Sequence, residues 1–488
     1  MLRRAIPSAT AARSVPLPLA LLLATALVLG LAWSVVTAPL QAFDESEHVA
    51  YAVHLAETGD RPAVDGGRGT YPGAEAIALD QLGLRRMLQN PGVKPAWRDR
   101  DAQAFDRAQD ALPADAAEAG DGPNPLAKNP PLYYALEAIP YRLTPGGFLT
   151  DLQAMRTVSV LLLVLTTLVA WLAAAELFTR MLPRVVAAGA VALHPMAGQI
   201  SGIVNADALL MLLSTTALWL AIRAFKRGPE PRRMALFGLA AGGALLTHGR
   251  GIALVPFVVA AAAVIALRHR DDLRRAAIGA GAALAGLALC GLVLKVIGGG
   301  TGGAYGGEAN FDVGGASVRG FLSFVWQFYL PPLETMGARV GPEYGFRQVF
   351  VDTGFASFGS YEVVLPEAAR AAVQVGLVGA FLVLLALGVR HWDRLKAHAL
   401  QVVLVGLFAG AIVGFLHLAS YRAILGGGDP LITGRYLLPA IGAFALALAT
   451  IADRLPRRAG ALAAAVVLVG LLTLSTMGIG ETLLRSYA

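Results

Sequence analysis

The stretch VPLPLALLLATALVLGLAWSVVTAPLQAFDESEH, from Val15 to His48, contains the two features that decide the fold. Its first part, Val15 to Leu40, is apolar and free of charge over the length that a membrane-spanning helix requires. It is longer than the apolar core of a signal peptide, so we expect a retained first span. Three carboxylates and a histidine follow directly, in the segment FDESEH. These groups either mark the edge of the membrane or belong to a reactive site.

The rest of the chain repeats the first feature. The protein is 56% hydrophobic and 15% charged, with a mean hydropathy of +0.60, which excludes an ordinary soluble domain. Further charge-free runs lie at about residues 157–175, 185–204, 208–222, 234–247, 251–267, 276–294, 371–389, 399–421, 436–452 and 459–480. They predict an all-α polytopic membrane protein with about eleven transmembrane helices.

The positions of lysine and arginine predict the orientation of these spans, because cytoplasmic connections are enriched in both residues. With a cytoplasmic N-terminus, every second connection should be basic, and each one is. These connections hold Arg3, Arg4 and Arg13; Arg180 and Arg184; Arg223, Lys226, Arg227, Arg232 and Arg233; Arg268, Arg270, Arg274 and Arg275; Arg390, Arg394 and Lys396; Arg454, Arg457 and Arg458. The net charge of +7 reflects this bias and indicates no nucleic-acid partner.

This topology predicts one domain, residues 1–488, with two long segments on the non-cytoplasmic side. The first is about residues 41–156 and the second about residues 295–370. FDESEH opens the first segment. The only cysteine, Cys290, lies within a predicted span, which excludes an intrachain disulfide.

Two parts of the first outer segment are patterned. From Asp44 to Gly59 one apolar stripe predicts an amphipathic helix on the membrane surface, ended by the glycine. Asp44 falls at its N-terminal end, where a carboxylate either caps the helix or does chemistry. Downstream, NPPLYY begins a second short helix. Its residues Tyr133 and Tyr134 suit the headgroup level of a membrane, so an interfacial anchor is the simplest interpretation.

Five motifs in order resemble the GT-C superfamily of membrane glycosyltransferases. They are FDESEH (43–48), NPPLYY (129–134), HPMAGQISGIVNADALL (194–210), LLTHGRG (245–251) and ITGRYLLPA (432–440). The resemblance is to the bacterial aminoarabinose and protein O-mannosyl transferases. It is greater still to a related group of bacterial membrane proteins with a PDE-x-x-H-like start and a QPPLYY-like segment. The chain departs from that group in two places: His248 replaces the lysine of an L-T-K-G turn, and Asn129 replaces a glutamine.

The resemblance implies that a sugar moves from a polyprenyl-phosphate donor to a glycan, lipid or protein acceptor, with inversion, in the bacterial inner membrane. The active site would then face the periplasm or exterior. Such a transfer needs a base, cations for the departing phosphate and an apolar groove for the lipid tail. Asp44 is the candidate base and Glu45 a second carboxylate. Arg435 is the first candidate to bind the donor phosphate, and Lys128 and Arg250 are secondary candidates.

Six further residues are candidates for contact with substrate: His48, Tyr133, Tyr134, Asn205, Asp207 and His248. Each basic or polar candidate also has an ordinary interpretation. Arg435 can be a topological anchor, Lys128 and Arg250 solvated loop charges, and Asn205 and Asp207 caps of the next span.

These motifs identify no certain cofactor, and no metal ligands are assigned. His48 and His54 could join Glu45 or Glu47 around a divalent metal, but their spacing matches no zinc signature. Two other functions stay open at this point. One is a polymerase or ligase of lipid-linked glycans, and the other is a membrane transporter or flippase, which would need ionisable groups deep in the spans.

Overall fold

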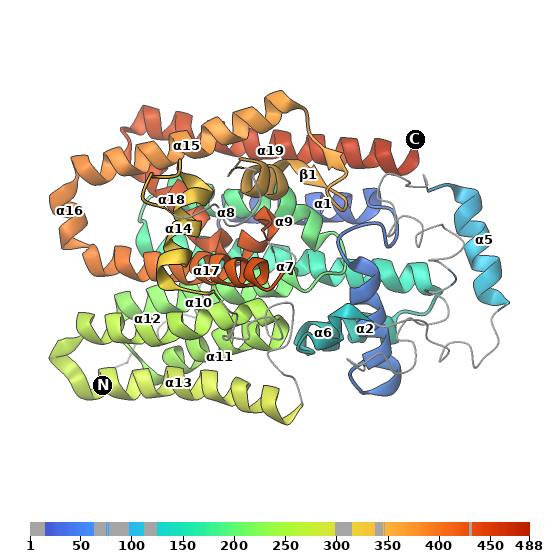
Figure 1. The fold of residues 1–488 in the computed structure, drawn as a ribbon, viewed down its shortest axis with the longest axis horizontal. Coiled ribbons are helices and arrows are strands. Elements are labelled where there is room, and N and C mark those ends of the chain that lie inside the picture. Colours follow the sequence, from blue (N-terminus) through green and yellow to red (C-terminus); the bar gives the residue numbers. More distant parts are fainter. Residues whose placement is uncertain are drawn as a thin grey trace, which may run out of the picture.

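The computed structural model describes residues 15–62, 75, 77, 97–111, 124–297, 315–336, 345, 347–428 and 432–488. Parts of both long segments predicted from the sequence therefore lie outside the described residues. Nearly all of the described chain forms helices, and most of the long ones run roughly along one direction, horizontal in Figure 1. The long helices are α1 (Leu17–Val36), α7 (Phe148–Leu177), α10 (Asp207–Arg227), α11 (Pro231–Thr247), α12 (Leu254–Arg268), α13 (Leu273–Val296), α15 (Glu367–Arg390), α17 (Ala399–Leu425), α18 (Ile441–Arg454) and α19 (Arg457–Tyr487).

Shorter elements connect and cap this bundle. They are α2 (Glu45–Thr58), α5 (Asp99–Asp110), α6 (Leu132–Leu143), α8 (Met181–Ala192), α9 (Pro195–Ser201), α14 (Val318–Tyr329) and α16 (Trp392–Ala397). The 3-10 helices are η1 (Pro125–Lys128), η2 (Gly249–Ala253), η3 (Arg270–Asp272) and η5 (Gly434–Ala440), and η4 (Arg347–Ala356) is a π-helix. Strands β1 (Ser357–Phe358) and β2 (Val363–Val364) pair antiparallel, with Ser357 opposite Val364.

The all-α polytopic class is confirmed, whereas the count of eleven spans is not. Nine helices of the described chain are long and apolar enough to cross a membrane. The expected span at residues 185–204 is broken. Helix α8 ends at Ala192 and α9 starts at Pro195, because a proline cannot continue the hydrogen bonding of the preceding turn. The expected span at 234–247 is the 17-residue helix α11, which packs between α10 and α13.

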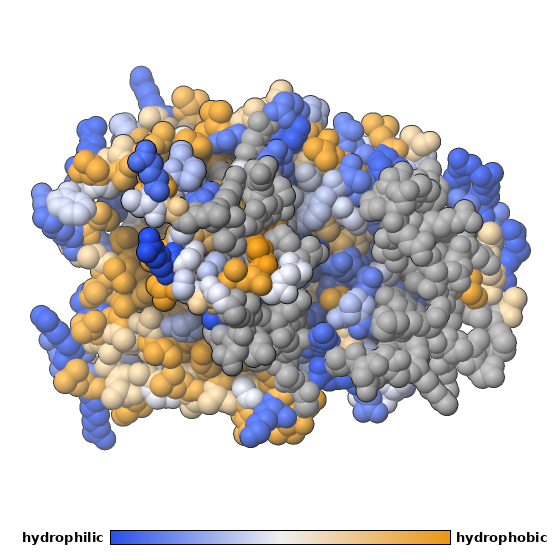
Figure 2. Space-filling model, in the orientation of Figure 1, coloured by the Kyte–Doolittle hydropathy of each residue, from blue (hydrophilic) through white to orange (hydrophobic). Residues whose placement is uncertain are grey.

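The bundle has an apolar core and an apolar outer surface. One large buried cluster joins α1, α7, α8, α9, α10, α11, α12, α17, α18 and α19. Large apolar side chains also point outward, among them Leu289 on α13 and Phe381 on α15. Figure 2 shows apolar side chains over α12 and α13 and hydrophilic ones at the end formed by α16. A helix that is apolar all round suits a hydrocarbon environment.

The end of the bundle opposite α16 is formed by α2, α5 and α6, and we call it the α2 end (Figure 1). Helix α2 starts and stops where the sequence predicts, and Gly59 ends it with φ +77°. It is not a surface helix, however. Polar as well as apolar side chains of α2 are buried, because α6 packs along it.

The two tyrosines of NPPLYY are not interfacial anchors. Tyr133 and Tyr134 are fully buried, in a second core shared by α2, α6, α7 and the start of α10. Their ring faces find apolar neighbours there and their hydroxyls find hydrogen-bond partners, so burial costs little. This core fixes α2, and with it the residues at the N-terminal end of α2.

Candidate active site

The candidate site begins where the chain passes from α1 to α2. Asp44 precedes α2 and has a left-handed backbone conformation, with φ +56° and ψ +20°, which aspartate tolerates better than most residues. Its side chain makes no capping hydrogen bond to the helix. Instead, Oδ2 accepts a hydrogen bond from Nη2 of Arg435 at 2.8 Å. Asp44 therefore occupies the cap position without capping, and half of its side chain (50%) is exposed.

Arg435 lies near the start of η5 and is buried between two aromatic rings. Its guanidinium carbon is 4.5 Å from the ring centre of Phe43 and 5.2 Å from that of Tyr436. Stacking of this kind stabilises a buried cation. Its Nε and Nη1 atoms have no hydrogen-bond partner within the described part of the chain. A buried guanidinium with unused donors is suited to bind an anion.

A close backbone contact sets the position of Arg435. A side chain at Gly434 would collide with the backbone of Phe350 and Gly354, both in η4. The Gly434 amide donates a hydrogen bond to Oγ1 of Thr353 at 2.7 Å. Helix η5 therefore lies directly on η4, and only glycine permits this approach.

A second arginine lies beside the first. Arg250, in η2, lies over the ring of Tyr436 as well, with its guanidinium carbon 4.3 Å from the ring centre. Its Nη2 atom forms an ion pair with Oδ1 of Asp207, at the start of α10. Nε and Nη1 of Arg250 are buried and bond to no residue that the structure describes. The two arginines thus share one aromatic ring and place four unused donor nitrogens in the same region.

His248 and Asn205 orient their neighbours. Nδ1 of His248 accepts a hydrogen bond from the backbone N–H of Arg250 at 3.1 Å, which caps η2. Asn205 accepts one from the Asp207 amide at 3.0 Å, in the turn just before α10, whose N-cap residue is Ala206. The side-chain amide of Asn205 also donates to the Phe43 carbonyl at 3.2 Å, and this contact ties α10 to the segment that carries Asp44.

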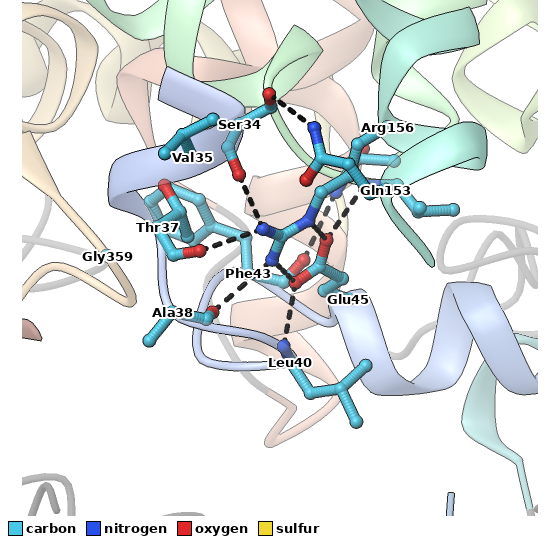
Figure 3. A network of polar contacts seen from close by, with 12 residues as sticks. Ser34, Val35, Thr37, Ala38, Leu40, Phe43, Glu45, Gln153, Arg156 and Gly359 are labelled. Atoms are coloured by element: carbon cyan, nitrogen blue, oxygen red, sulfur yellow. Dashed lines mark hydrogen bonds and ion pairs between the residues drawn. The ribbon is translucent and has the colours of Figure 1, made fainter. Parts of the chain in front are cut away.

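Glu45 is the best-bonded carboxylate of the site and the least exposed. Figure 3 shows it facing Arg156 of α7, whose Nε and Nη2 atoms donate to its two oxygens at 2.7 and 2.6 Å. The backbone amides of Leu40 and Val204 donate to the same oxygens at 3.0 and 3.1 Å. Glu45 is 0% exposed, and both oxygens are occupied.

Arg156 uses the rest of its guanidinium to hold the segment between α1 and α2. It donates to the carbonyls of Ser34 and Thr37 at 2.7 and 2.8 Å, and to that of Ala38 at 3.3 Å. The pair therefore links α7 to the segment between Ser34 and Glu45, as Figure 3 shows. This geometry favours a positioning role for Glu45 over contact with a substrate.

His48 and the NPPLYY segment form a buried aromatic network behind the site. Nδ1 of His48 lies 3.0 Å from the hydroxyl of Tyr134, which also accepts from the Asn129 side chain at 3.0 Å. Tyr134 stacks on Tyr51 at 3.7 Å, and Tyr133 bonds to Ser159 at 2.8 Å. All of these contacts join α2 to α6 and α7.

The pKa values of the ionisable groups in the site are shifted by burial and by neighbouring charges. Partial burial of Asp44 opposes its ionisation, but the charge and hydrogen bond of Arg435 outweigh it, so the pKa of Asp44 lies below its ordinary value. Burial lowers the pKa of His48 to about 4. Burial and the charge of Arg250 hold the pKa of His248 well below its ordinary value. Both histidines are neutral at pH 7, so the anion-binding charge comes from arginines.

Two expected features are not part of this cluster. Lys128 ends η1, is exposed and forms no ion pair with a residue that the structure describes. His54 lies near the far end of α2. Among the described residues, no group of three or more histidine, cysteine, aspartate or glutamate side chains could hold a metal ion.

A long apolar groove starts at Gly434, the residue before Arg435. Its volume is about 730 Å³, and it is lined by η4, α15, α17 and α18. At the site end its walls include Gly354, Phe355 and Gly434. It follows α15 from Leu377 to His391, which is about 21 Å at 1.5 Å per residue. We call this cavity the α15 groove.

Sequence reasoning missed Arg156, Phe43 and Tyr436 as parts of the site. Arg156 is a charged residue about two turns inside an apolar helix, and such a residue usually has a buried partner. That signal could have identified it, although not its partner. The aromatic rings carry no comparable signal, because aromatic residues recur throughout the chain.

Comparison with solved structures identifies the fold. ArnT from Cupriavidus metallidurans bound to undecaprenyl phosphate superposes with a TM-score of 0.50 at 16% identity, over 95% of this chain and 76% of ArnT. ArnT in the apo state superposes with a TM-score of 0.48 at 16% identity, over 95% of this chain and 75% of ArnT. A third structure is the archaeal oligosaccharyltransferase AglB from Archaeoglobus fulgidus in complex with an inhibitory peptide and a dolichol-phosphate. It superposes with a TM-score of 0.42 at 14% identity, over 96% of this chain and 56% of AglB. The GT-C fold expected from the five motifs is confirmed by ArnT.

Comparison of sequences adds one match. A family described as "Predicted membrane protein (DUF2142)" matches residues 27–443, which include every residue of the candidate site. No curated protein matches the sequence significantly.

Proposed function

The chain belongs to the DUF2142 family of membrane proteins, and we propose that it transfers a sugar from a polyprenyl-phosphate-linked donor to an acceptor hydroxyl. One observation carries this proposal. Two buried arginines, Arg250 and Arg435, have unused donor nitrogens and lie beside a half-exposed aspartate, and an apolar groove begins at Gly434, the residue before Arg435. A phosphate with a long isoprenoid tail matches that arrangement in charge and in shape.

The donor phosphate is proposed to bind between the two arginines. Charge-assisted hydrogen bonds from guanidinium groups are among the strongest available to a phosphate, and burial strengthens them further. They also stabilise the negative charge that develops on the phosphate as the sugar leaves. His248 supports this role indirectly, since it caps the turn that carries Arg250 and adds no charge.

The isoprenoid tail is proposed to lie in the α15 groove. The walls between its two ends are apolar, for example Leu384 and Val405, and the lining continues into η5, where it includes Gly434 and Leu437. ArnT, which shares the fold, was crystallised with undecaprenyl phosphate. A lipid-linked donor therefore suits both the cavity of this chain and the fold.

Asp44 is proposed to be the general base. The acceptor oxygen bonds to the anomeric carbon while its proton moves to Asp44. The bond from that carbon to the phosphate oxygen breaks, and its electron pair stays on the polyprenyl phosphate. Attack from the side opposite the phosphate inverts the configuration.

The ion pair with Arg435 makes the basicity of Asp44 depend on whether the donor is bound. While the pair is intact, the pKa of Asp44 is low and the carboxylate is a weak base. A donor phosphate that draws the charge of Arg435 toward itself raises the pKa of Asp44 and strengthens the base. Asp44 then becomes competent when the donor is bound.

The site is proposed to face the periplasm or exterior, in a single GT-C domain over residues 1–488 embedded in the bacterial inner membrane. Basic turns gather at the α16 end: Arg180 reaches Asp453 at 3.7 Å, and Arg227 reaches Glu176 at 2.8 Å. The candidate site lies at the opposite, α2 end. The positive-inside rule then makes the α16 end cytoplasmic.

Binding of undecaprenyl phosphate to the purified full-length protein tests this function. Arg435→Ala should weaken binding by about 2–3 kcal/mol, roughly 30- to 150-fold, the worth of hydrogen bonds to a charged group. Arg435→Lys should lose less, because it keeps the charge but not the fork of donors. Arg319→Ala, which removes an exposed arginine of α14, is the matched control. Unchanged affinity in the Arg435→Ala variant would show that Arg435 is only an anchor.

A further inference from the structure

The α15 groove has a second polar end, which the proposed reaction does not use. Opposite the candidate site, its lining changes from apolar residues to His391, Arg394, His398, Gln401 and Arg454. These side chains come from α16, α17 and α18 and from the turns on either side of α16. A groove whose walls are apolar and whose rim is cationic is built for an amphiphile with an anionic head.

The charge at this rim is only partly balanced. Asp453 lies 3.6 Å from Arg454 and 3.7 Å from Arg180, so one carboxylate serves two arginines. Arg394 forms no ion pair with any residue in the described part of the chain. Its backbone carbonyl accepts a hydrogen bond from His398 at 2.9 Å, which draws the α16 turn toward the start of α17. The rim therefore keeps an excess of positive charge.

The apolar walls need an occupant as well. No residue of α15 is buried by the rest of the protein, and this helix packs mainly on α18, η4 and α16. The groove side of α15 is thus separated from α17, and lipid must fill that space in a membrane. Acyl chains alone would enter without selectivity, so selectivity comes from the head that meets the cationic rim.

We propose that the α16 end of the groove binds an anionic glycerophospholipid, with its phosphate between Arg394 and Arg454 and one acyl chain inside the groove. Its placement in the cytoplasmic leaflet rests on the orientation proposed above, whereas the binding chemistry does not. The donor's tail and this acyl chain then enter one cavity from opposite ends. The bound phospholipid closes the lower groove and limits how far the isoprenoid tail descends.

Lipid titration of the purified full-length protein in detergent, read by native mass spectrometry, tests the proposal. Phosphatidylglycerol, phosphatidylcholine and undecaprenyl phosphate are the three probes. We expect phosphatidylglycerol to bind about 10-fold tighter than phosphatidylcholine, as a contact between a phospholipid and two cations allows. The variant Arg394→Ala/Arg454→Ala should lose that preference and still bind undecaprenyl phosphate like the parent.

The control variant is Arg457→Ala/Arg458→Ala. It removes two arginines from the same end of the bundle, but neither lines the groove, so its preference for phosphatidylglycerol should match the parent's. Gly406→Leu provides a second test, because Gly406 lines the groove and has open space where a side chain would begin. It should weaken the binding of both phosphatidylglycerol and undecaprenyl phosphate.

Three results would overturn the proposal: no preference for phosphatidylglycerol in the parent, an unchanged preference in the Arg394→Ala/Arg454→Ala variant, or a parallel loss in the control. Loss of undecaprenyl phosphate instead of phosphatidylglycerol would assign the rim to the isoprenoid lipid. If the double variant does not fold, Arg394→Gln alone carries the test, because this exposed side chain leaves no buried partner behind. Phosphatidylglycerol binding can succeed where the transferase proposal fails, so the two are separable.

Discussion

Replacing Glu45 with glutamine should destabilise the protein more than any other single amide substitution in α2. The change keeps the shape of the side chain and removes its charge. Arg156, which is 2% exposed, then remains buried with no counter-ion. Four donors face the Glu45 oxygens, two from Arg156 and two from the backbone. The new amide nitrogen must point at one pair of them.

The expected loss follows from these contacts. Breaking a buried ion pair by neutralising one partner costs about 3–5 kcal/mol, because the other charge is left uncompensated. At roughly 2 °C per kcal/mol for a large chain, the unfolding midpoint should fall by about 6–10 °C. The turn from Thr37 to Asp44 should loosen with it, so sugar transfer should fall in the same variant.

The single cysteine provides the assay. Cys290 is buried in α13, so a thiol-reactive fluorophore labels it only as the bundle opens during heating. Glu57→Gln is the matched control, since Glu57 lies on the same helix, is exposed and, among the residues that the structure describes, bonds only to Tyr141. Its midpoint should stay within about 1 °C of the parent, as for most surface substitutions. A Glu45→Gln protein that unfolds with the control would refute the view that this pair holds the site together.

Two further substitutions test other parts of the account. Burial raises the pKa of Glu137 to about 8, so between about pH 4.5 and pH 8 the folded state keeps a proton that the unfolded state has lost. The stabilisation of the folded state by this protonated carboxyl is complete below about pH 4.5 and is lost as the pH rises through 8. Glu137→Gln should therefore raise the thermal midpoint relative to the parent at pH 8 and not at pH 5, and an equal effect at both values would contradict the assignment. Gly434→Ala should separate η5 from η4, since the added carbon meets the backbone of Phe350 and Gly354, and should cost about 1–3 kcal/mol of stability together with binding of undecaprenyl phosphate. A Gly434→Ala protein with parental binding would show that this contact does not set the position of Arg435.

Much of the fold could be predicted from the sequence, because it depends on local pattern. Apolar runs and basic turns predict the bundle, and the stripe after Asp44 followed by Gly59 predicts α2 almost to the residue. The motifs also identified Asp44, Arg250 and Arg435, which the structure brings together from segments far apart in the chain. What these residues do stays a prediction until transfer is measured.

The errors have a common origin in tertiary packing. Whether α2 lies on a membrane or inside the protein depends on α6, and the stripe alone cannot distinguish the two. Likewise, the sequence presents Glu45 and Asp44 as equivalent neighbours. Their difference arises only when Arg156 meets one of them and Arg435 the other.

The most direct test of the central claim is the rate of sugar transfer by an Asp44→Asn variant. Asparagine keeps the size of the side chain and tolerates the left-handed backbone of Asp44, and the wild-type side chain makes no capping bond that would be lost. Lipid-linked donors extracted from bacterial membranes would be supplied to the purified protein, and release of free polyprenyl phosphate would be measured. When the unfolding midpoint, read from the labelling of Cys290 during heating, and the binding of undecaprenyl phosphate are both close to parental, transfer should still fall about 10²- to 10⁴-fold, the usual contribution of a general base. Transfer at the parental rate would contradict the assignment of Asp44 as the base.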